Sequence, residues 1–194
     1  MNKLKQSIPE NAKKVFAGKL FDVYQWEQEM FDGSKQIFER VTKIDTAVVI
    51  AFTEDGKILV LNQEQPARGK YTSLPSGMIE RGDEPMQTAE RELLEETGYV
   101  AKELKLWHSH QLHDKVVWTY FYFIAKGCRK VSEQKLDVGG EKIEVMELEM
   151  SEFLDMLLVQ KIKGSEIIMK MMNEDLIVID KEKTLDKIKN YFNN

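Results

Sequence analysis

Three glutamates lie within little more than one helical turn of the segment GMIERGDEPMQTAERELLEETGY, residues 77–99. Glu92, Glu95 and Glu96 are spaced i, i+3 and i+4, so they would share one face of a helix. One interpretation is a solvated acidic face, because repulsion between such neighbours costs only roughly 0.2–0.5 kcal/mol per pair. The other is a site for a hard cation, since carboxylate oxygens that converge on Mg²⁺ can link it to substrate phosphates. The spacing alone leaves both interpretations open.

The ends of the helix that would carry these glutamates are marked in the sequence. Pro85 suits the first helical turn, and either Asp83 or Glu84 can stand at the N-terminus. Gly98 suits the position just beyond the last turn. We therefore predict a helix over about residues 84–97, entered from a loop in PARGKYTSLPSG, residues 66–77.

Strand patterns dominate the rest of the chain. Residues 15–43 are typical of a small antiparallel β unit, because two stretches rich in aromatic and β-branched residues flank the turn DGS. Apolar and alternating patterns then predict strands at TAVVIAFT, KILVLNQEQ, LKLWHSHQL, VVWTYFYFIA and EKIEVMELE. Helical patterns follow near SEFLDMLLVQ and on to the C-terminus. This order favours a mixed sheet layered with helices.

Length and composition narrow the classes of protein. The 194 residues, 42 % hydrophobic and 31 % charged, are enough for one main core. A net charge of −5 argues against a nucleic acid polymer as partner. Cys128 is the only cysteine, and no apolar run resembles a signal peptide or approaches the roughly 20 residues of a membrane helix. We expect a cytoplasmic protein that binds no membrane.

The segment as a whole resembles the Nudix box, the signature of the Nudix hydrolase family. That pattern is Gly, five residues, Glu, seven residues, then Arg-Glu-aliphatic-any-Glu-Glu-any-Gly-aliphatic. Asp83 stands where the family has Glu, and Tyr99 stands where it usually has an aliphatic residue. The resemblance implies that residue 83 helps to hold Arg91, and the shorter Asp predicts a longer or water-bridged ion pair. The matching positions are Gly77, Arg91, Glu92, Leu93, Glu95, Glu96 and Gly98.

The resemblance implies both a fold and a reaction. The fold would be of the α/β (α+β) class, a Nudix-type mixed β-sheet sandwiched between helices, with an N-terminal antiparallel β unit (1–43) before the hydrolase domain (44–194). The reaction would be Mg²⁺-dependent cleavage of a nucleoside diphosphate linked to another moiety, with Mn²⁺ able to substitute. A cation is needed there because the negative pyrophosphate repels attacking water. The implied metal ligands are the Ser76 carbonyl, Glu92, Glu95 and Glu96, and the implied catalytic residues are Arg91, Glu95, Glu96 and Glu141.

Within the family the chain looks most like the ADP-ribose pyrophosphatase branch. That branch has an N-terminal β unit, a Q-x-R-x-P strand end, seen here as QEQPARG, and an LPAG entry to the box, seen here as LPSG. In the acidic loop DVGGEKIEV, Glu141 falls where a catalytic or metal-binding glutamate is expected, although a surface loop glutamate is the alternative. Gln65 replaces an arginine that would contact phosphate, and Ser73 replaces an acidic residue. Arg68 is a candidate for supplying the lost charge.

Aromatic residues of the N-terminal unit are candidates for binding the substrate. Trp26 and Phe38 could stack on a nucleobase, as aromatics of this unit do in the resembled branch, or they could pack within a small β layer. In that branch the unit crosses a two-fold axis and helps to complete the partner's site. We therefore expect the chain to form a homodimer and to bind a small nucleotide as its substrate.

The histidines have no clear pattern for a metal. His108, His110 and His113 all lie in WHSHQLHDK, but no cysteine or further ligand stands at metal spacing, so a polar loop is the favoured interpretation. The general base stays open among Glu141, His113 and Asp114.

Two other functions compete with nucleotide sugar hydrolysis. A sanitising nucleoside triphosphate pyrophosphohydrolase is disfavoured by the N-terminal β unit, which the compact triphosphate branch generally lacks. A non-catalytic nucleotide-binding regulator with the Nudix fold is disfavoured by the intact Arg91, Glu92, Glu95 and Glu96 set. The departures at Asp83, Gln65 and Ser73 keep it in consideration.

Overall fold

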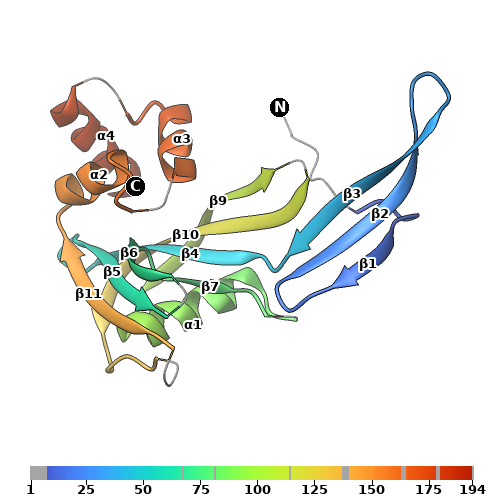
Figure 1. The fold of residues 1–194 in the computed structure, drawn as a ribbon. Helices are drawn as coiled ribbons and strands as arrows, with labels where there is room; N and C mark the ends of the chain where they lie inside the picture. Colours follow the sequence, from blue (N-terminus) through green and yellow to red (C-terminus); the bar gives the residue numbers. More distant parts are fainter. Residues whose placement is uncertain are drawn as a thin grey trace.

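A mixed β-sheet forms the centre of the computed structural model, and helices pack on both of its faces (Figure 1). The structure describes residues 8–66, 68–80, 82–113, 115–136, 140–162, 165–177 and 180–193. Its strands are β1 (Lys13–Ala17), β2 (Phe21–Glu29), β3 (Lys35–Lys43), β4 (Thr46–Thr53), β5 (Ile58–Gln65), β6 (Gly69–Ser73), β7 (Ser76–Met78), β8 (Tyr99–Val100), β9 (Glu103–His113), β10 (Val116–Lys130) and β11 (Lys142–Leu148). Its helices are α1 (Pro85–Thr97), α2 (Met150–Leu158), α3 (Ser165–Asn173) and α4 (Lys181–Asn193). In these described ranges no helix is long and apolar enough to cross a membrane.

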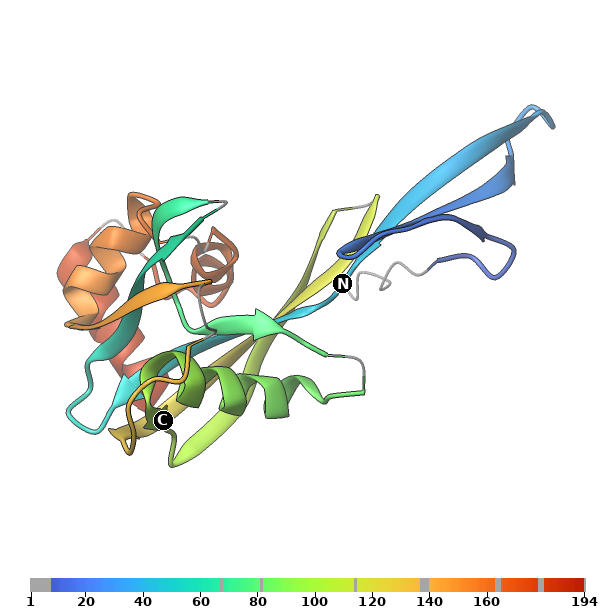
Figure 2. The same cartoon turned by 60° about the horizontal axis from the view of Figure 1, so that its bottom comes forward.

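The first three strands form an arm that projects from the body of the molecule (Figures 1 and 2). Strands β2 and β3 pair antiparallel over their whole length. The turn between them is stabilised by the Asp32 carboxylate, which accepts hydrogen bonds from the Ser34 amide (2.9 Å) and hydroxyl (2.6 Å). The predicted hairpin is confirmed, and β1 adds a third strand at its edge. The arm joins the body through a short parallel pairing of β3 with β10, at Val41 and Thr42.

The body of the sheet is mixed, as predicted. Its strands follow the order β3-β10-β4-β5-β11, with β10 parallel to β4 and β5 antiparallel to both β4 and β11. The prediction of a loop over residues 66–77 is wrong in part, because this segment contains β6 and begins β7. Strand β6 pairs with β5, and β7 pairs with β4 far back along the chain. These partners supply backbone hydrogen bonds that local proline and glycine signals do not reveal.

Alternation along β4 divides the core into two layers. Val48 and Ile50 face a large cluster that includes residues of α2, α3 and α4. Ala47, Val49 and Ala51 face the other way, toward Ala89 and Leu93 of α1. Small side chains on this second face let the glutamate helix lie close to the sheet. The predicted sandwich of a sheet between helices is therefore confirmed.

Helix α1 begins and ends as predicted. Glu84 is the N-cap in a capping box with Gln87, and Pro85 is the first helical residue. Gly98 ends the helix with φ of 77°, and a Cβ at this position would overlap the carbonyl oxygen of Ser132. Glycine is thus required here both by the backbone conformation and by the neighbouring chain.

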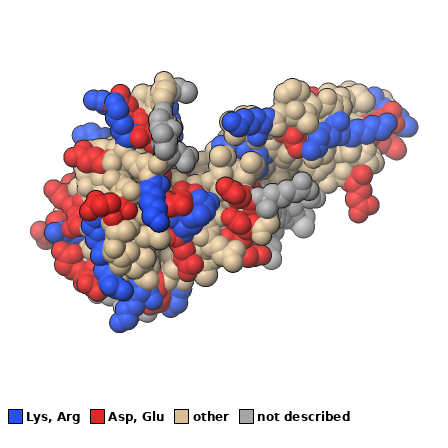
Figure 3. Space-filling view, turned by 90° about the horizontal axis from the view of Figure 1, so that it is seen from below, with Lys and Arg blue, Asp and Glu red and all other residues tan. Residues whose placement is uncertain are grey.

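Charged side chains are mixed over the face drawn in Figure 3. Lys and Arg are interspersed with Asp and Glu on both the body and the arm. On this face the described residues form no broad basic surface.

Candidate active site

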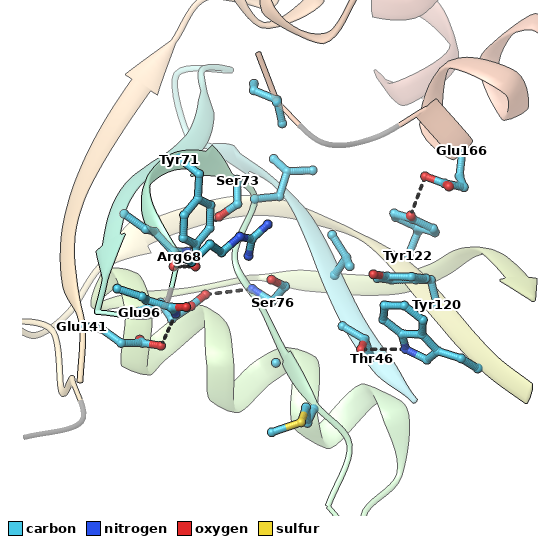
Figure 4. A pocket seen from close by; sticks show the side chains of 18 of the residues that line it. Thr46, Arg68, Tyr71, Ser73, Ser76, Glu96, Tyr120, Tyr122, Glu141 and Glu166 are labelled. Atoms are coloured by element: carbon cyan, nitrogen blue, oxygen red, sulfur yellow. Dashed lines mark hydrogen bonds between the residues drawn. The ribbon is translucent and has the colours of Figure 1, made fainter. Parts of the chain in front are cut away.

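A cavity of about 560 Å³ lies where the predicted box meets the sheet, between the ends of β5 and β6, the short strand β7 and the first half of β10 (Figure 4). The box contributes Gly77, Met78 and Glu96 to its lining, and Ser76, just before the box, lies beside them. The cavity is large enough for a small-molecule ligand. Polar and charged groups from distant parts of the chain converge on it.

Glu96 is the buried carboxylate of the site. Its residue is only 7 % exposed, and Oε2 accepts a hydrogen bond of 2.8 Å from the backbone NH of Ser76. Burial raises the pKa of Glu96 to about 9; the Ser76 hydrogen bond opposes the rise, and the charges of Glu92, Glu141 and Glu95 add to it. A buried carboxylate surrounded by three others lacks a compensating positive charge.

Gly77 allows Glu92 to lie against the loop. A Cβ on Gly77 would overlap the Glu92 carboxylate, so any larger residue at this position would displace it. Burial also raises the pKa of Glu92, while the neighbouring Arg91 lowers it. The requirement for glycine at the start of the box therefore has a direct steric cause.

Arg91 holds two of the box glutamates. Its Nη1 lies 2.8 Å from Oε1 of Glu92 and 3.1 Å from Oε2 of Glu95. The Glu95 side chain is 40 % exposed and lies outside the cavity lining. The expected partner, Asp83, makes no ion pair with Arg91 among the described residues. Arg91 thus fixes the neighbouring glutamates rather than bridging to the loop before the helix.

The structure brings the loop glutamate to the box. Glu141 lines the cavity together with Glu96, and its charge acts on both Glu92 and Glu96. Nε2 of Gln65 donates a hydrogen bond of 2.6 Å to Glu141 Oε1. The residue that replaces the expected arginine therefore orients an acidic side chain without adding a positive charge.

Two cationic side chains face the same cavity. Arg68 lines it with its guanidinium 3.7 Å from the centre of the Tyr71 ring. Lys43 lines it with Nζ 3.4 Å from the centre of the Trp118 ring. Burial lowers the pKa of Lys43, and the charge of Arg68 lowers it further. Sequence reasoning included Arg68 but missed Lys43, which is the last residue of the arm strand β3 and carries no motif.

Ser73 belongs to a neutral hydrogen-bond chain on the cavity wall. The Tyr71 hydroxyl donates to Gln63 Oε1 (2.6 Å), and Gln63 Nε2 donates to the Ser73 hydroxyl (2.8 Å). The absence of an acidic residue at position 73 therefore leaves no unsatisfied partner in this chain of hydrogen bonds.

The aromatic residues of the cavity are not the ones predicted. Trp26 and Phe38 contact each other on the arm, with ring centroids 6.0 Å apart, and neither lines the cavity of its own chain. Trp118, Tyr120 and Tyr122 of β10 line it instead. Their i, i+2 spacing in VVWTYFYFIA indicates that they share one face of the strand. The segment is apolar on both faces, so the sequence does not show which face borders a cavity.

The histidine-rich strand lies beside the cavity. His108 stacks on His110 and on Tyr122, with centroids 6.1 and 6.3 Å apart, and neither histidine lines the cavity. The side chain of His113 and the whole of Asp114 lie outside the described residues. Of the three candidates for general base, only Glu141 can be located.

The donor atoms at the site suit a hard divalent cation. The charges of Glu92, Glu141 and Glu95 act on the buried Glu96 carboxylate beside Ser76, and hard cations prefer oxygen ligands of this kind. Among the described residues, no three His, Cys, Asp or Glu side chains are already gathered as a complete metal-binding group. The residues therefore fit Mg²⁺ or Mn²⁺ by chemistry, with substrate oxygens able to complete the coordination.

Comparison with known proteins gives consistent matches. The NUDIX domain family model matches residues 42–167. The chain is 32 % identical to an ADP-ribose pyrophosphatase of Bacillus subtilis (strain 168) over 150 residues, 75 % of this chain and 80 % of that protein. It is 27 % identical to a methanol dehydrogenase activator of Bacillus methanolicus over 174 residues, 87 % of this chain and 92 % of that protein. A crystal structure of an ADP compounds hydrolase has the same fold, with a TM-score of 0.67, 15 % identity, and 95 % and 92 % of the two chains covered.

Proposed function

This chain belongs to the NUDIX domain family and is a Nudix pyrophosphohydrolase, and on that premise we propose that it hydrolyses ADP-ribose or a related nucleoside diphosphate sugar with Mg²⁺. Water adds across one P–O bond of the diphosphate bridge and yields AMP and a sugar phosphate. The similarity to an ADP-ribose pyrophosphatase over most of both chains supports this class of substrate.

The observation that carries the proposal is the buried Glu96 beside Glu92 and Glu141. A divalent cation bound there would neutralise phosphate oxygens and lower the pKa of a bound water. Glu92, Glu96 and the Ser76 carbonyl would hold the cation, with Glu95 on the flank of the same helix. These groups satisfy the main demand of the reaction, which is charge neutralisation at the diphosphate.

The other residues of the cavity have distinct roles in this proposal. Arg68 and Lys43, which both line the cavity, attract the diphosphate. Glu141, oriented by the hydrogen bond from Gln65, accepts a proton from the attacking water. Arg91 keeps Glu92 and Glu95 in position by its two ion pairs.

The arm supports the proposal of a homodimer. Several apolar side chains on it face solvent in the single chain; Ile37 is 66 % exposed and Phe16 is 58 % exposed. A three-stranded arm that projects from the body has little else to cover them (Figure 2). Packing of two arms across a two-fold axis would bury this surface. Trp26 and Phe38 could contact substrate only from such a partner.

Light scattering tests the assembly. The dimer predicts a mass near 45 kDa, twice the 22.6 kDa of one chain. Removal of residues 1–43 should give a monomer or an aggregate with weaker substrate binding. A full-length chain that is monomeric at micromolar concentration and fully active would contradict the dimer.

One further function has an observation in its favour. The similarity to a methanol dehydrogenase activator covers more of this chain than does the similarity to the pyrophosphatase. A regulator of this kind would bind a nucleotide and act on a partner enzyme. Three residues depart from the pattern of the resembled branch, namely Gln65, Ser73 and Asp83. These are the positions where a regulator would differ from an active pyrophosphatase.

A product assay separates these functions. The purified chain is incubated with Mg²⁺ and, separately, ADP-ribose or a nucleoside triphosphate, and the products are resolved by chromatography. AMP with ribose 5-phosphate supports the proposal, whereas a monophosphate with pyrophosphate identifies a triphosphate hydrolase. Nucleotide binding in calorimetry without any product identifies a regulator. Repeating the assay with Mn²⁺ and with EDTA tests the cation.

A further inference from the structure

The wall of the cavity contains an acidic side chain to which the proposed reaction gives no role. Glu166, in the first turn of α3, lines the cavity together with Gln160 and Ile162 from the segment before that helix. Figure 4 shows Glu166 on the side of the cavity away from Glu96 and Glu141. The proposed function requires this cavity to bind an anionic diphosphate, so a carboxylate at this place opposes the ligand.

The start of α3 is held firmly against the body of the protein. Ile167 and Met171 of this helix are buried in the core. Just before the helix, Ile162 is buried and forms an isolated β-bridge with Thr72 of β6. The half-buried Glu166 therefore keeps its carboxylate at one place on the cavity wall.

Glu166 has a hydrogen-bond donor but no cationic partner. The Tyr122 hydroxyl donates to Oε2 of Glu166 at 3.4 Å. Lys170, one turn further along α3, pairs with Glu174 instead, and no ion pair within the described parts of the chain includes Glu166. A cationic partner would cancel the charge of this carboxylate, whereas a neutral hydroxyl leaves that charge in the cavity.

The charge of Glu166 acts along the face of β10 that borders the cavity. Burial and then this charge raise the pKa of Tyr120 to about 12, and the same two causes raise the pKa of Tyr122. Both hydroxyls therefore stay neutral at physiological pH. Neither tyrosine offsets or adds to the charge of the carboxylate.

The balance of charge in the cavity depends on Glu166. Among the described residues of the lining, the cations are Lys43 and Arg68. Glu96, with a pKa of about 9, is protonated at neutral pH without a bound metal, so Glu141 and Glu166 supply the opposing charges. Loss of the charge at position 166 would leave one unbalanced positive charge.

We propose that Glu166 is a specificity-determining residue that weakens the binding of nucleotides increasingly as their negative charge rises. It favours a diphosphate that ends in a neutral sugar over a nucleotide that carries a further phosphate. Such selection needs no contact with the preferred ligand, because it arises from repulsion of the competitors. This inference rests on the proposed function, which supplies the diphosphate ligand.

Calorimetry in EDTA measures the binding of ADP-ribose, ADP and ATP, whose negative charge increases in this order. EDTA removes divalent cations, so the charges of the chain alone act on the nucleotide. Glu166→Gln keeps the size of the side chain, and its amide oxygen can accept the hydrogen bond from Tyr122. All three dissociation constants should fall relative to the native chain, least for ADP-ribose and most for ATP.

The dependence on salt gives the expected magnitude. For a charge about 10 Å away in an effective dielectric of about 20, ATP should gain about 7-fold more than ADP at an ionic strength of about 0.01 M. The same difference should shrink to about 2-fold at about 0.15 M, because salt screens the interaction. A difference that does not change with salt would contradict the electrostatic role.

Matched variants separate charge from structure. Glu166→Asp keeps the charge and should lack the gain for ATP. Glu182→Gln makes the same change as Glu166→Gln in the first turn of α4, at an exposed position outside the cavity lining, and should leave all three dissociation constants unchanged. Tyr122→Phe removes the hydrogen bond to Glu166 but keeps the carboxylate, so it should not reproduce the gain for ATP.

The outcomes distinguish this inference from the proposed reaction. Equal changes for the three nucleotides in Glu166→Gln, or no tighter binding of ATP, would overturn the inference. So would the same charge-dependent gain in Tyr122→Phe. A charge-dependent gain in a chain that hydrolyses none of the three nucleotides with Mg²⁺ would reject the reaction and keep the inference, whereas hydrolysis of ADP-ribose without that gain would do the reverse.

Discussion

Glu96→Gln tests the metal site most directly, because it removes a carboxylate that would ionise on a bound cation and changes almost nothing else. The side chain is buried, and its Oε2 accepts a hydrogen bond of 2.8 Å from Ser76. A glutamine has the same shape, and its amide oxygen can accept the same bond. Unlike the carboxylate, the amide never has to ionise against the charges of Glu92 and Glu141. The fold should therefore survive while the site loses one charged ligand.

The expected magnitudes can be worked out for activity and for metal binding. Loss of one preorganised electrostatic group reduces kcat by about 100-fold or more, which corresponds to roughly 2.7 kcal/mol. At a Mg²⁺ concentration of about 100 times Kd, the native chain gains roughly 2.7 kcal/mol of stability. If affinity falls about 100-fold, the gain at the same concentration falls to about 0.4 kcal/mol. For a chain of this length the Mg²⁺-dependent rise in Tm should drop from roughly 5–11 °C to about 1 °C.

The assay measures ADP-ribose turnover and Tm with Mg²⁺ and with EDTA. Glu90→Gln is the matched control, because it makes the same change at an exposed position of the same helix. It should keep both native activity and the native response to Mg²⁺. If Glu96→Gln retained more than half of the native rate at saturating Mg²⁺, or kept the full Mg²⁺-dependent rise in Tm, the assignment of Glu96 as a metal ligand would be refuted.

Three further substitutions test the surrounding groups. Gly77→Ala should lower kcat by up to about 100-fold, because the added Cβ would displace the Glu92 carboxylate. Steady-state kinetics measure kcat, and a variant with native-like circular dichroism and unchanged kcat would contradict this. Glu141→Gln should lower kcat by about 100-fold with little change in KM if Glu141 is the base, and an unaltered pH–rate profile and kcat would exclude that role. Asp83→Glu should leave kcat/KM unchanged or higher, because Arg91 already pairs within the helix, so an inactive but folded variant would show a separate role for Asp83.

The sequence predicts the elements whose signals are local. The limits of α1 follow from Pro85 and Gly98, and the arm hairpin follows from its turn at residues 32–34. Strands β6 and β7 were missed because their partners, β5 and β4, lie elsewhere in the chain. Proline and glycine mark where a chain turns, but they do not show whether the backbone between them finds a partner.

The candidate site was predicted in the same uneven way. The box glutamates have a fixed spacing and Glu141 follows from the resemblance; of these, the structure places Glu96 and Glu141 in the cavity lining and leaves Glu95 outside it. The cavity aromatics Trp118 and Tyr120 were missed because the same strand carries Phe121 and Phe123 on its opposite face. Both faces of the strand are therefore apolar, and the alternation of polar and apolar residues that would mark a cavity-facing side is absent. Lys43 belongs to no motif, and only the packing of the arm against β10 brings it to the cavity.

The balance of charge in the cavity explains why a cation matters for binding as well as for chemistry. Among the described residues that line it, Lys43 and Arg68 are opposed by three acidic side chains, Glu96, Glu141 and Glu166. A diphosphate entering this cavity alone would meet no net positive charge, because Glu141 and Glu166 offset the two cations, and neither Glu96, with a pKa of about 9, nor Gln65 adds a positive charge. A divalent cation among the box glutamates would make the site net positive, because a bound cation is often the largest local charge in such a site. Under the proposed function, the same acidic cluster would favour a metal-bound nucleotide over free phosphate.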